Sequence, residues 1–441
     1  MKIELPRGAA FALERLESRG FEAWVVGGCM RDSLLGRCPG DWDVTTSALP
    51  EETLACFADC RVIETGLRHG TVTVLHEGEP LEITTYRVDG SYADGRHPDS
   101  VTFSRTLTDD LSRRDFTVNA MAYHPERGLV DLFGGREDLE GKRIRTVGDA
   151  ETRFHEDGLR ILRALRFASV LGFTIEEKTA NAIHACRHLL ERIAAERIRE
   201  EFNKLICGKG AVEILREFSD VITFVIPELA PMVGFDQNSR YHCYDVWEHT
   251  LHALAAAEST RLNVRLGILL HDVGKPHVYT EDHKGGHFPG HAEVGVELTD
   301  AILRRLRYDN ATRELLLKLV KYHDVPLQAE KKHIKRAILR FGVEGLRELL
   351  EIQRCDRVAH APGHREMPLY YGEIPGLLEE ILREDACLSL KTLAVKGNDL
   401  IALGYRPGRE LGECLNRLLD AVIDGELPND REALLNSLKN G

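Results

Sequence analysis

The sequence predicts an α+β protein, in which a small α/β head precedes a long, all-α remainder. Residues 1 to about 145 mix helical with strand-like apolar periodicity, which is typical of an α/β domain. From about residue 150 onward, apolar residues recur at three- and four-residue spacing, which predicts helices almost throughout. A chain of 441 residues is also too long for a single hydrophobic core, because domains usually hold roughly 100 to 200 residues.

The composition, with 43% hydrophobic and 29% charged residues, is that of an ordinary soluble protein. The N-terminal segment is amphipathic and no run of about 18 apolar residues occurs, so we expect a cytoplasmic protein without a membrane span. The ten cysteines include no CxxC pair, which favours reduced thiols over disulfides or a zinc ribbon. A net charge of −13 argues against nucleic-acid binding by the whole surface, although residues 157 to 216 hold 11 Lys/Arg against 8 Asp/Glu.

The elements of the head follow in order. An amphipathic helix opens the chain, and a short strand is expected at Ala23 to Val26 with a helix after Gly28. A strand is then expected through Asp41 to Thr46, followed by a hairpin that runs from TVTVLH across EGEP to LEITTYR.

Glycines, an arginine and two aspartates stand close together in WVVGGCMRDSLLGRCPGDWDVTT. Gly27, Gly28 and Arg31, at a strand-to-helix turn, would let backbone N–H groups and a cation approach a nucleotide triphosphate. Side chains of a strand alternate faces, so Asp41 and Asp43 would point the same way and share one Mg²⁺. A solvated turn is the alternative for the two aspartates, and a plain tight turn for the glycines.

Two later segments extend this site. Glu82 in LEITTYR lies on a strand that could pair beside the aspartates and supply a third carboxylate for two cations; an exposed strand residue without a role is the alternative. In LSRRDFTVNAMAY, we expect Arg114 to bind phosphate, whereas Arg113 is expected to be a surface partner of Asp110.

The segment EDGLRILRALRFASVLGF predicts a helix with one apolar stripe and one charged side. The stripe consists of Ile161, Leu162, Leu165 and Ala168, and the charged side of Asp157, Arg160, Arg163 and Arg166. A solvated side with ion pairs is one interpretation. The other is base recognition: cytosine and adenine both present an amino donor beside a ring-nitrogen acceptor, which an aspartate and an arginine can match. Uracil and guanine would leave both protein groups mismatched, so such a pocket would accept CTP and ATP only.

Seven ordered stretches resemble the bacterial class II tRNA nucleotidyltransferases, the CCA-adding enzymes and their poly(A) polymerase relatives, over roughly residues 20 to 206. The stretches are GGCMRDSLLGR, GDWDVTTSALPEE, LEITTYR, RRDFTVNAMAY, DLFGGREDL, EDGLRILRALRFA and ERIREEF. The resemblance implies Mg²⁺ on Asp41 and Asp43 with Glu82 as the third catalytic carboxylate. It places Gly28, Arg31 and Arg114 at the triphosphate, Asp157 and Arg160 at the base, and Arg163 and Arg166 near the nucleotide.

The resemblance implies four domains: a nucleotidyltransferase head at 1–145, a helical neck at 146–215, a helical body at 216–365 and a tRNA-binding helical tail at 366–441. The expected reaction is template-independent addition of CCA to the 3′ end of tRNA from CTP and ATP. An A-adding enzyme and a poly(A) polymerase are the alternatives. The loop VDGSYADGRHPDSVTF resembles one that enzymes adding the terminal A retain, which favours CCA or A addition over CC addition.

A second set of polar residues occupies residues 240 to 360. It consists of His249, His271, Asp272, His291, His323 and Asp356. An adjacent His-Asp followed by a distant Asp resembles the HD superfamily of metal-dependent phosphohydrolases, whose ligands bind Mg²⁺, Mn²⁺, Ni²⁺ or Fe and activate a water. The alternatives are core or surface histidines, and a body that binds tRNA without hydrolysis. Whether the protein is a monomer or a homodimer is left open.

Overall fold

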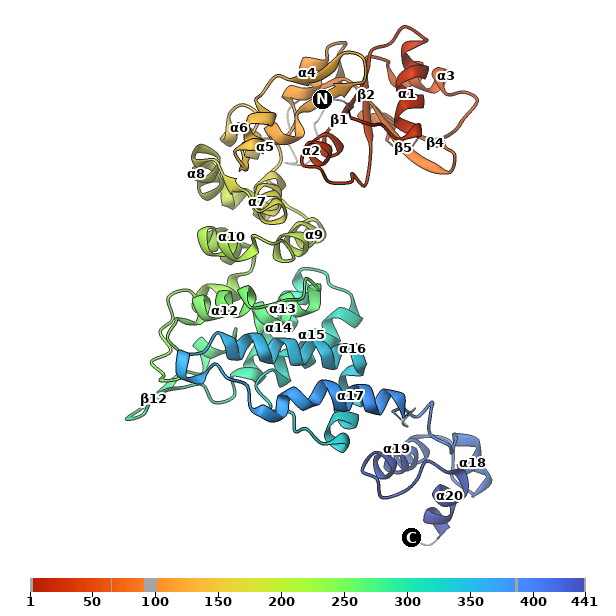
Figure 1. Ribbon diagram of the computed structural model, residues 1–441, viewed down its shortest axis with the longest axis vertical. Coiled ribbons are helices and arrows are strands. Elements are labelled where there is room, and N and C mark those ends of the chain that lie inside the picture. Colours follow the sequence, from red (N-terminus) through yellow and green to blue (C-terminus); the bar gives the residue numbers. More distant parts are fainter. Residues whose placement is uncertain (1–2, 65, 91–100, 385–387, 440–441) are drawn as a thin grey trace. The chain divides into compact units, whose positions relative to one another are not determined.

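The computed structural model describes residues 3–64, 66–90, 101–384 and 388–439. The chain forms two compact units, Met1–Ala230 and Pro231–Gly441, which are traced from red to green and from green to blue in Figure 1. The predicted division into four domains is finer than this and stays a prediction. Among the described residues, no helix is both long and apolar enough to cross a membrane.

The first unit begins with the head. Its strands are β1 (Ala23–Val26), β2 (Asp43–Thr46), β3 (Arg61–Ile63), β4 (Thr71–His76), β5 (Glu79–Thr85), β6 (Arg87–Asp89), β7 (Val101–Phe103), β8 (Met121–His124) and β9 (Gly128–Asp131). Its helices are α1 (Arg7–Glu17), α2 (Gly28–Leu34), α3 (Pro50–Cys56), α4 (Leu107–Ser112) and α5 (Gly135–Glu140). Seven strands form one sheet in the order β3-β4-β5-β2-β1-β8-β9, in which only β2 and β5 run parallel. The α+β class is therefore confirmed.

The predicted elements of the head are largely present. Strand β1 has the predicted bounds, and the hairpin of β4 and β5 turns at Glu77 and Gly78, which both have positive φ. The strand expected from Asp41 begins only at Asp43, so this boundary was wrong. The reason is that β1 ends at Val26, the partner of Asp43, and leaves nothing for Asp41 to pair with. Most of the loop VDGSYADGRHPDSVTF lies outside the described residues.

The rest of the first unit is helical. Its helices are α6 (Ala150–Glu156), α7 (Leu159–Leu171), α8 (Glu177–Cys186), α9 (Ala195–Ile206), α10 (Ala211–Glu217) and α11 (Ser219–Val225). Strands β10 (Arg143–Ile144) and β11 (Thr174–Ile175) form a short parallel pair, which the helical pattern did not predict. The predicted stripe of α7 is confirmed, since all four of its residues are fully buried and the helix packs against α9.

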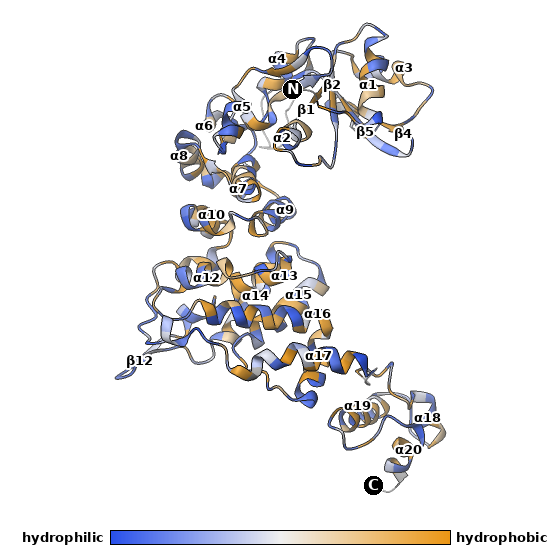
Figure 2. Ribbon diagram, in the orientation of Figure 1, coloured by the Kyte–Doolittle hydropathy of each residue, from blue (hydrophilic) through white to orange (hydrophobic). Residues whose placement is uncertain are grey.

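The second unit begins with a helical body. Its elements are α12 (Val246–Ala255), α13 (Leu262–Leu270), β12 (Thr280–Asp282), β13 (Gly285–His287), α14 (His291–Arg305), α15 (Asn310–Tyr322) and α16 (Lys331–Val358). Strands β12 and β13 form a small hairpin, again not predicted. Helix α16 is broken at Gly342, which has φ 73°. Figure 2 shows hydrophobic and hydrophilic residues alternating along the body helices, so that each has an apolar side for the core.

The unit ends with α17 (Ile374–Arg383), α18 (Gly397–Ala402), α19 (Arg409–Ile423) and α20 (Arg431–Lys439). Buried residues such as Leu400, Cys414 and Leu418 form a separate small core there. The segment GYRPGRELG makes the turn from α18 into α19, with positive φ at Gly404 and Gly408. Short 3₁₀ helices lie at Leu67–His69, Thr117–Asn119, Arg187–Arg192, Pro227–Met232, Lys275–His277, Pro362–His364 and Leu369–Glu373.

Candidate functional sites

Two of the three predicted carboxylates stand side by side on the head sheet. Val44 of β2 pairs with Ile83 of the parallel strand β5, so the residues before them, Asp43 and Glu82, point to the same face. Asp41 is exposed just before β2. Burial raises the pKa of Asp43, and the charges of Glu82 and Asp41 add to this effect. The structure therefore brings together the oxygen ligands that a hard divalent cation prefers.

A glycine turn brings an arginine beside Asp43. Gly27 joins β1 to α2 with φ +85°, a conformation that L side chains rarely adopt. A Cβ at this position would lie 3.0 Å from Arg114 Nη1 and 3.7 Å from Asp43 Oδ2. The Arg114 charge also opposes the effect of burial on the pKa of Asp43. Only glycine therefore leaves Arg114 and Asp43 this close to the backbone of the turn.

A buried carboxylate orients Arg114. Asp110 is fully buried, and its Oδ2 accepts a hydrogen bond from Arg114 Nη2 at 3.2 Å. Its Oδ1 accepts one from Arg113 Nε at 3.0 Å. Although burial acts to raise the pKa of Asp110, the two arginines hold it below its usual value. Arg113 is thus the predicted partner of Asp110, but the pair is not a surface contact, because Asp110 has no exposed side-chain area.

Arg31 joins the head to α7. Its Nη1 donates to Asn119 Oδ1 at 2.9 Å and its Nε to Asp32 Oδ1 at 2.9 Å. The guanidinium also lies over the Phe167 ring, 5.0 Å from the centroid. These contacts fix the arginine at the start of α2, where the sequence predicts a triphosphate.

The predicted base-reading pair does not share one helix. Asp157 is the residue that follows α6. Its Oδ1 accepts a hydrogen bond at 3.0 Å from the N–H of Leu159, the first residue of α7, so the aspartate caps α7 without being part of it. The prediction of one continuous charged side from Asp157 was therefore wrong, because the capping aspartate has extended backbone. Arg160 lies in the first turn of α7 and is 9% exposed.

Asp157 and Arg160 are each also bound by a residue outside the pair. Arg197 Nη2 of α9 donates to Asp157 Oδ2 at 3.0 Å. Arg160 pairs with Glu156 and donates from Nη2 to the Arg113 carbonyl at 3.3 Å. Both side chains are consequently held in place before any nucleotide binds.

The other two arginines of α7 have partners of their own. Arg163 donates from Nε and Nη2 to Asp115 Oδ2 at 2.9 and 2.6 Å. Arg166 Nε donates to Glu201 Oε2 at 2.5 Å, and its guanidinium stacks 3.7 Å from the Phe167 centroid. Burial acts against the ionisation of Asp115, yet Arg163 and neighbouring donors hold its pKa at about 2. No sequence pattern indicates Asp115 as the partner, since 48 residues separate it from Arg163.

The six polar residues predicted in the body converge from helices α12, α14 and α16 and from the residues that directly follow α13 and α15. They form two groups, the first of His249, His271, Asp272 and Asp356, and the second of Asp272, His291 and His323. In the first group, His249 Nε2 lies 2.9 Å from Asp356 Oδ1. In the second, the Nε2 atoms of His291 and His323 lie 3.3 Å apart, and each is 3.7 Å from Asp272 Oδ1. Asp272 therefore belongs to both groups.

The four histidines all present the same ring nitrogen. Their Nδ1 atoms lie near backbone carbonyls, at 3.3 Å for His249 and Ala359, 2.6 Å for His271 and Ile268, 3.0 Å for His291 and Phe288, and 2.7 Å for His323 and Val320. A carbonyl accepts only the Nδ1–H tautomer, so in the neutral ring the lone pair is on Nε2 and faces the cluster. This arrangement fits a divalent cation.

Although burial acts to lower the pKa of His271, Asp272 and Asp356 raise it to about 10, so a cation bound there would replace the proton on its Nε2. Although burial acts to raise the pKa of Asp272, His271 and Lys275 hold it well below its usual value. Asp356 is likewise kept ionised against burial by His249 and His271. Two ionised carboxylates among imidazoles suit Mg²⁺ or a first-row transition metal.

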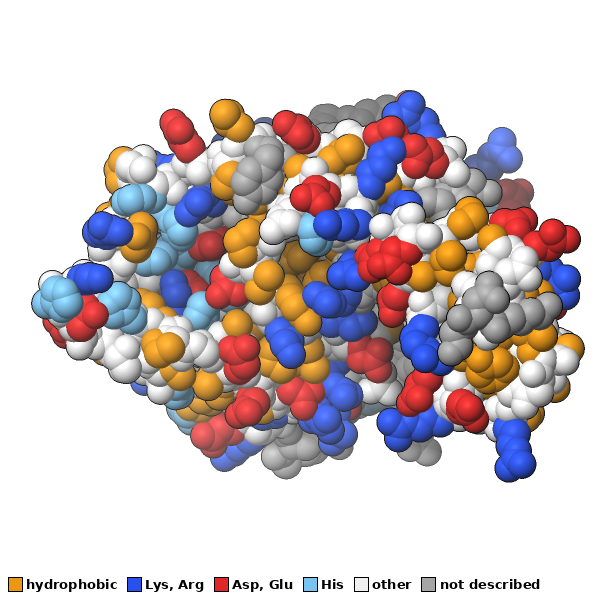
Figure 3. All heavy atoms as spheres, turned by 90° about the horizontal axis from the view of Figure 1, so that it is seen from below, with side chains coloured by type: hydrophobic (Ala, Val, Ile, Leu, Met, Phe, Trp, Pro, Cys, Tyr) orange, Lys and Arg blue, Asp and Glu red, His pale blue; other side chains and the backbone are white. Residues whose placement is uncertain are grey.

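Three basic residues that the sequence analysis did not assign lie at the same cavity, which holds about 430 Å³: Lys275, His242 and His360. Lys275 Nζ is 2.7 Å from Asp272 Oδ2. His360 follows Asp356 by four residues, a spacing that would have placed both on one side of a helix. Figure 3 shows histidine side chains, in pale blue, gathered with acidic and basic ones around a hollow at the left of the view.

Three family models match separate parts of the chain. Residues 23–145 match "Poly A polymerase head domain", residues 172–232 match "Probable RNA and SrmB- binding site of polymerase A", and residues 295–438 match "tRNA nucleotidyltransferase domain 2".

Curated relatives match nearly the whole chain. The CCA-adding enzyme of Lactobacillus helveticus is 37% identical over 425 residues, which cover 96% of this chain and 94% of the relative. That of Bacillus cereus is 33% identical over 98% of both chains. Among solved structures, the Bacillus stearothermophilus CCA-adding enzyme in complex with CTP is 30% identical, with a TM-score of 0.75 over 99% of both chains. The Thermotoga maritima CCA-adding enzyme complexed with tRNA shares the fold at 21% identity, with a TM-score of 0.57 over 98% of this chain and 94% of that one.

Proposed function

Because this chain belongs to the family of CCA-adding enzymes, we propose that it adds CCA to the 3′ end of tRNA, without a template, from CTP and ATP. The full-length likeness to named CCA-adding enzymes carries this conclusion. The activity is that of a nucleotidyltransferase in tRNA processing, with tRNA, CTP and ATP as partners. The cytoplasmic location stays a prediction of the sequence, and the choice between monomer and homodimer stays open.

In the reaction, the tRNA 3′-hydroxyl attacks the α-phosphate in line and pyrophosphate leaves. Asp41, Asp43 and Glu82 are the residues that would hold Mg²⁺. Bound there, Mg²⁺ would acidify the attacking hydroxyl and neutralise charge on the leaving group. Gly28 of the turn, Arg31 and Arg114 receive the triphosphate.

The base is selected by Asp157 and Arg160. The aspartate accepts the exocyclic amino group of cytosine or adenine, and the arginine donates to the adjacent ring nitrogen. The contacts with Arg197 and Glu156 support this role, because they hold both side chains before the nucleotide arrives. Arg163 and Arg166 shape the pocket through Phe167, over which both guanidinium groups lie.

A gel extension assay tests this function. A tRNA lacking its 3′ CCA is incubated with Mg²⁺ and with CTP, ATP, UTP or GTP, singly and in pairs. We expect two C and then one A, and no product from UTP or GTP. Asp43→Asn should abolish extension, whereas Asp59→Asn, an exposed carboxylate of the head, should leave it unchanged.

Other products in this assay would assign other activities. Addition of A alone to tRNA ending in CC would make the protein an A-adding enzyme, and long A tails would make it a poly(A) polymerase. No extension by the unaltered protein would refute the function of the head.

A second activity is favoured by the convergence of six ligands in the body. We propose that His249, His271, Asp272, His291, His323 and Asp356 form an HD-type metal centre that hydrolyses a phosphate ester. Each of the two groups would hold one cation, and a cation held there would supply an activated water. Lys275 and Arg357, which line the same cavity, bring positive charge to the phosphate.

p-Nitrophenyl phosphate and its bis-ester are suitable probes of this centre, in the presence of Mg²⁺, Mn²⁺, Ni²⁺ or Fe²⁺. Hydrolysis should be lost in His271→Asn and retained in Asp43→Asn, because the two sites use different residues. Hydrolysis that survives in His271→Asn, or no hydrolysis with any of these ions, would refute the second activity.

A further inference from the structure

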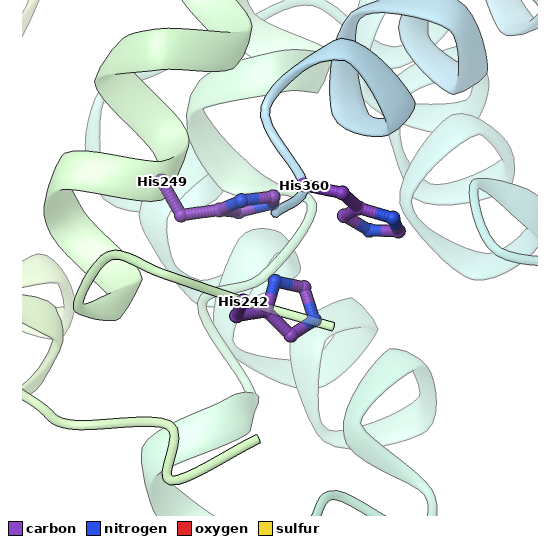
Figure 4. Close-up of side chains that lie close together, drawn as sticks. All are labelled: His242, His249 and His360. Carbon is purple, nitrogen blue, oxygen red and sulfur yellow. The ribbon is translucent and has the colours of Figure 1, made fainter. Parts of the chain in front are cut away.

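Three histidines from separate segments meet beside the HD-type centre. Figure 4 shows His249 on α12, His242 on the loop before it, and His360 just after α16. One ring nitrogen of each lies within 4.8 Å of the others. The His242 ring centroid is 4.8 Å from that of His249 and 4.7 Å from that of His360.

His242 has an unsatisfied polar atom in this place. Its Nδ1 is buried and, in the part of the chain that the structure describes, forms no hydrogen bond. A buried nitrogen without a partner is destabilising, so its position calls for a ligand. The ring also lines the cavity at which the two groups of ligands of the HD-type centre lie.

His249 cannot serve two cations. Its Nδ1 lies 3.3 Å from the Ala359 carbonyl, which leaves only Nε2, and Nε2 lies 2.9 Å from Asp356 Oδ1 and 3.5 Å from Asp272 Oδ2. That atom therefore belongs to the first group of the centre.

Asp356 can link the groups instead. Its Oδ1 lies 2.9 Å from His249 Nε2 and 3.5 Å from His360 Nε2, and a carboxylate has two oxygens that can each bind a cation. The carboxylate consequently reaches both the HD-type centre and the neighbouring pair of histidines.

We propose that His242, His360 and a bridging Asp356 hold a third cation, so that the body binds three divalent metal ions in a row. This inference rests on the proposed HD-type centre. Asp356 joins the third position to the first, as Asp272 joins the first to the second. Two imidazoles and one carboxylate favour a first-row transition metal over Mg²⁺. Three cations with Lys275 and Arg357 in one cavity suit a ligand with a dianionic terminal phosphate, a phosphomonoester.

The test counts bound cobalt. The full chain with Asp41→Asn and Asp43→Asn, which removes the head ligands, is freed of metal with a chelator, loaded with Co²⁺ and passed through a desalting column. The metal is then counted by mass spectrometry, and visible absorption reports the ligands of Co²⁺. The comparison variants are His242→Asn with His360→Asn together, His271→Asn, and His283→Asn as a matched control on an exposed histidine. Circular dichroism confirms that each variant is folded.

We expect three equivalents of Co²⁺ in the parent and in His283→Asn, but two in the double variant, with a change in the visible spectrum. Equal counts in the parent and the double variant would overturn the third position, whatever that count is. The HD-type centre is judged separately: if His271→Asn retains the full count of the parent, the proposed centre itself fails.

Discussion

The ion pair between Asp115 and Arg163 is expected to hold the head against α7, and Arg163→Met tests it. Asp115 is buried, which acts to raise its pKa, but Arg163, with smaller effects of Asn119 and Arg160, lowers that pKa from 3.8 to about 2. At about 1.4 kcal/mol per pKa unit, this net shift corresponds to about 2–3 kcal/mol of stability at neutral pH. A depressed carboxyl pKa contributes its full stability above the unfolded value of 3.8, and this is lost as pH falls toward 2.

Without Arg163, burial raises the pKa of Asp115, and the Asn119 hydrogen bond and the Arg160 charge oppose only part of this rise. The variant should then be destabilised by about 2–3 kcal/mol at pH 7, below the roughly 3–5 kcal/mol of a fully buried pair, because Arg163 is 34% exposed. The deficit should shrink as pH is lowered toward the raised pKa, since protonation removes the unpaired charge.

Urea unfolding at pH 7.5 and pH 3 measures this effect, because only the lower pH lies between the unfolded and the folded pKa of Asp115. Trp24 and Trp42 report the head when Trp247 is replaced by Phe. Adding Asp115→Asn to Arg163→Met should recover part of the loss, because no buried charge remains. A deficit that is independent of pH, or no recovery in the double variant, would refute the reasoning and assign the loss to packing over Phe167.

Three further changes have expected outcomes. Gly27→Ala should lower nucleotide addition at least tenfold and reduce the melting temperature by a few degrees. The reason is that a Cβ there would lie 3.0 Å from Arg114 Nη1, in a backbone conformation that suits glycine. Unchanged extension kinetics would contradict this. Arg197→Met should raise misincorporation of UTP roughly tenfold by releasing Asp157, as seen in single-nucleotide extension, and unaltered selectivity would show that Arg197 is dispensable. Burial raises the pKa of the Cys355 thiol to about 12, so iodoacetamide at pH 8 should leave it unlabelled in folded protein, and labelling at the rate of unfolded protein would contradict its burial.

Local pattern predicted much of the head and of α7. The turn at Gly27, strand β1, the hairpin and the buried stripe of α7 follow from periodicity and turn chemistry, which act over a few residues. The strand at Asp41 was predicted too long, because strand length depends on the partner strand.

The site residues that were not predicted from the sequence are brought to the sites by tertiary contacts. Arg197 lies 40 residues from Asp157, and His242 lies 118 residues from His360 (360 − 242), although their rings are neighbours. No short-range signal connects such residues. The six body ligands were predicted together because their motif resembles a known family, whereas His242 and His360 stand outside that motif.

In the proposed body centre, Asp272 belongs to both groups of ligands, so this one carboxylate would link the binding of the two cations. A cation bound at one position orients the carboxylate and removes its conformational freedom, so the next cation binds to a carboxylate that is already ordered. Metal binding at the two positions should therefore be linked, with few singly loaded chains at intermediate metal concentrations. At limiting metal, the body would then change from an empty to a filled centre over a narrow range of concentration.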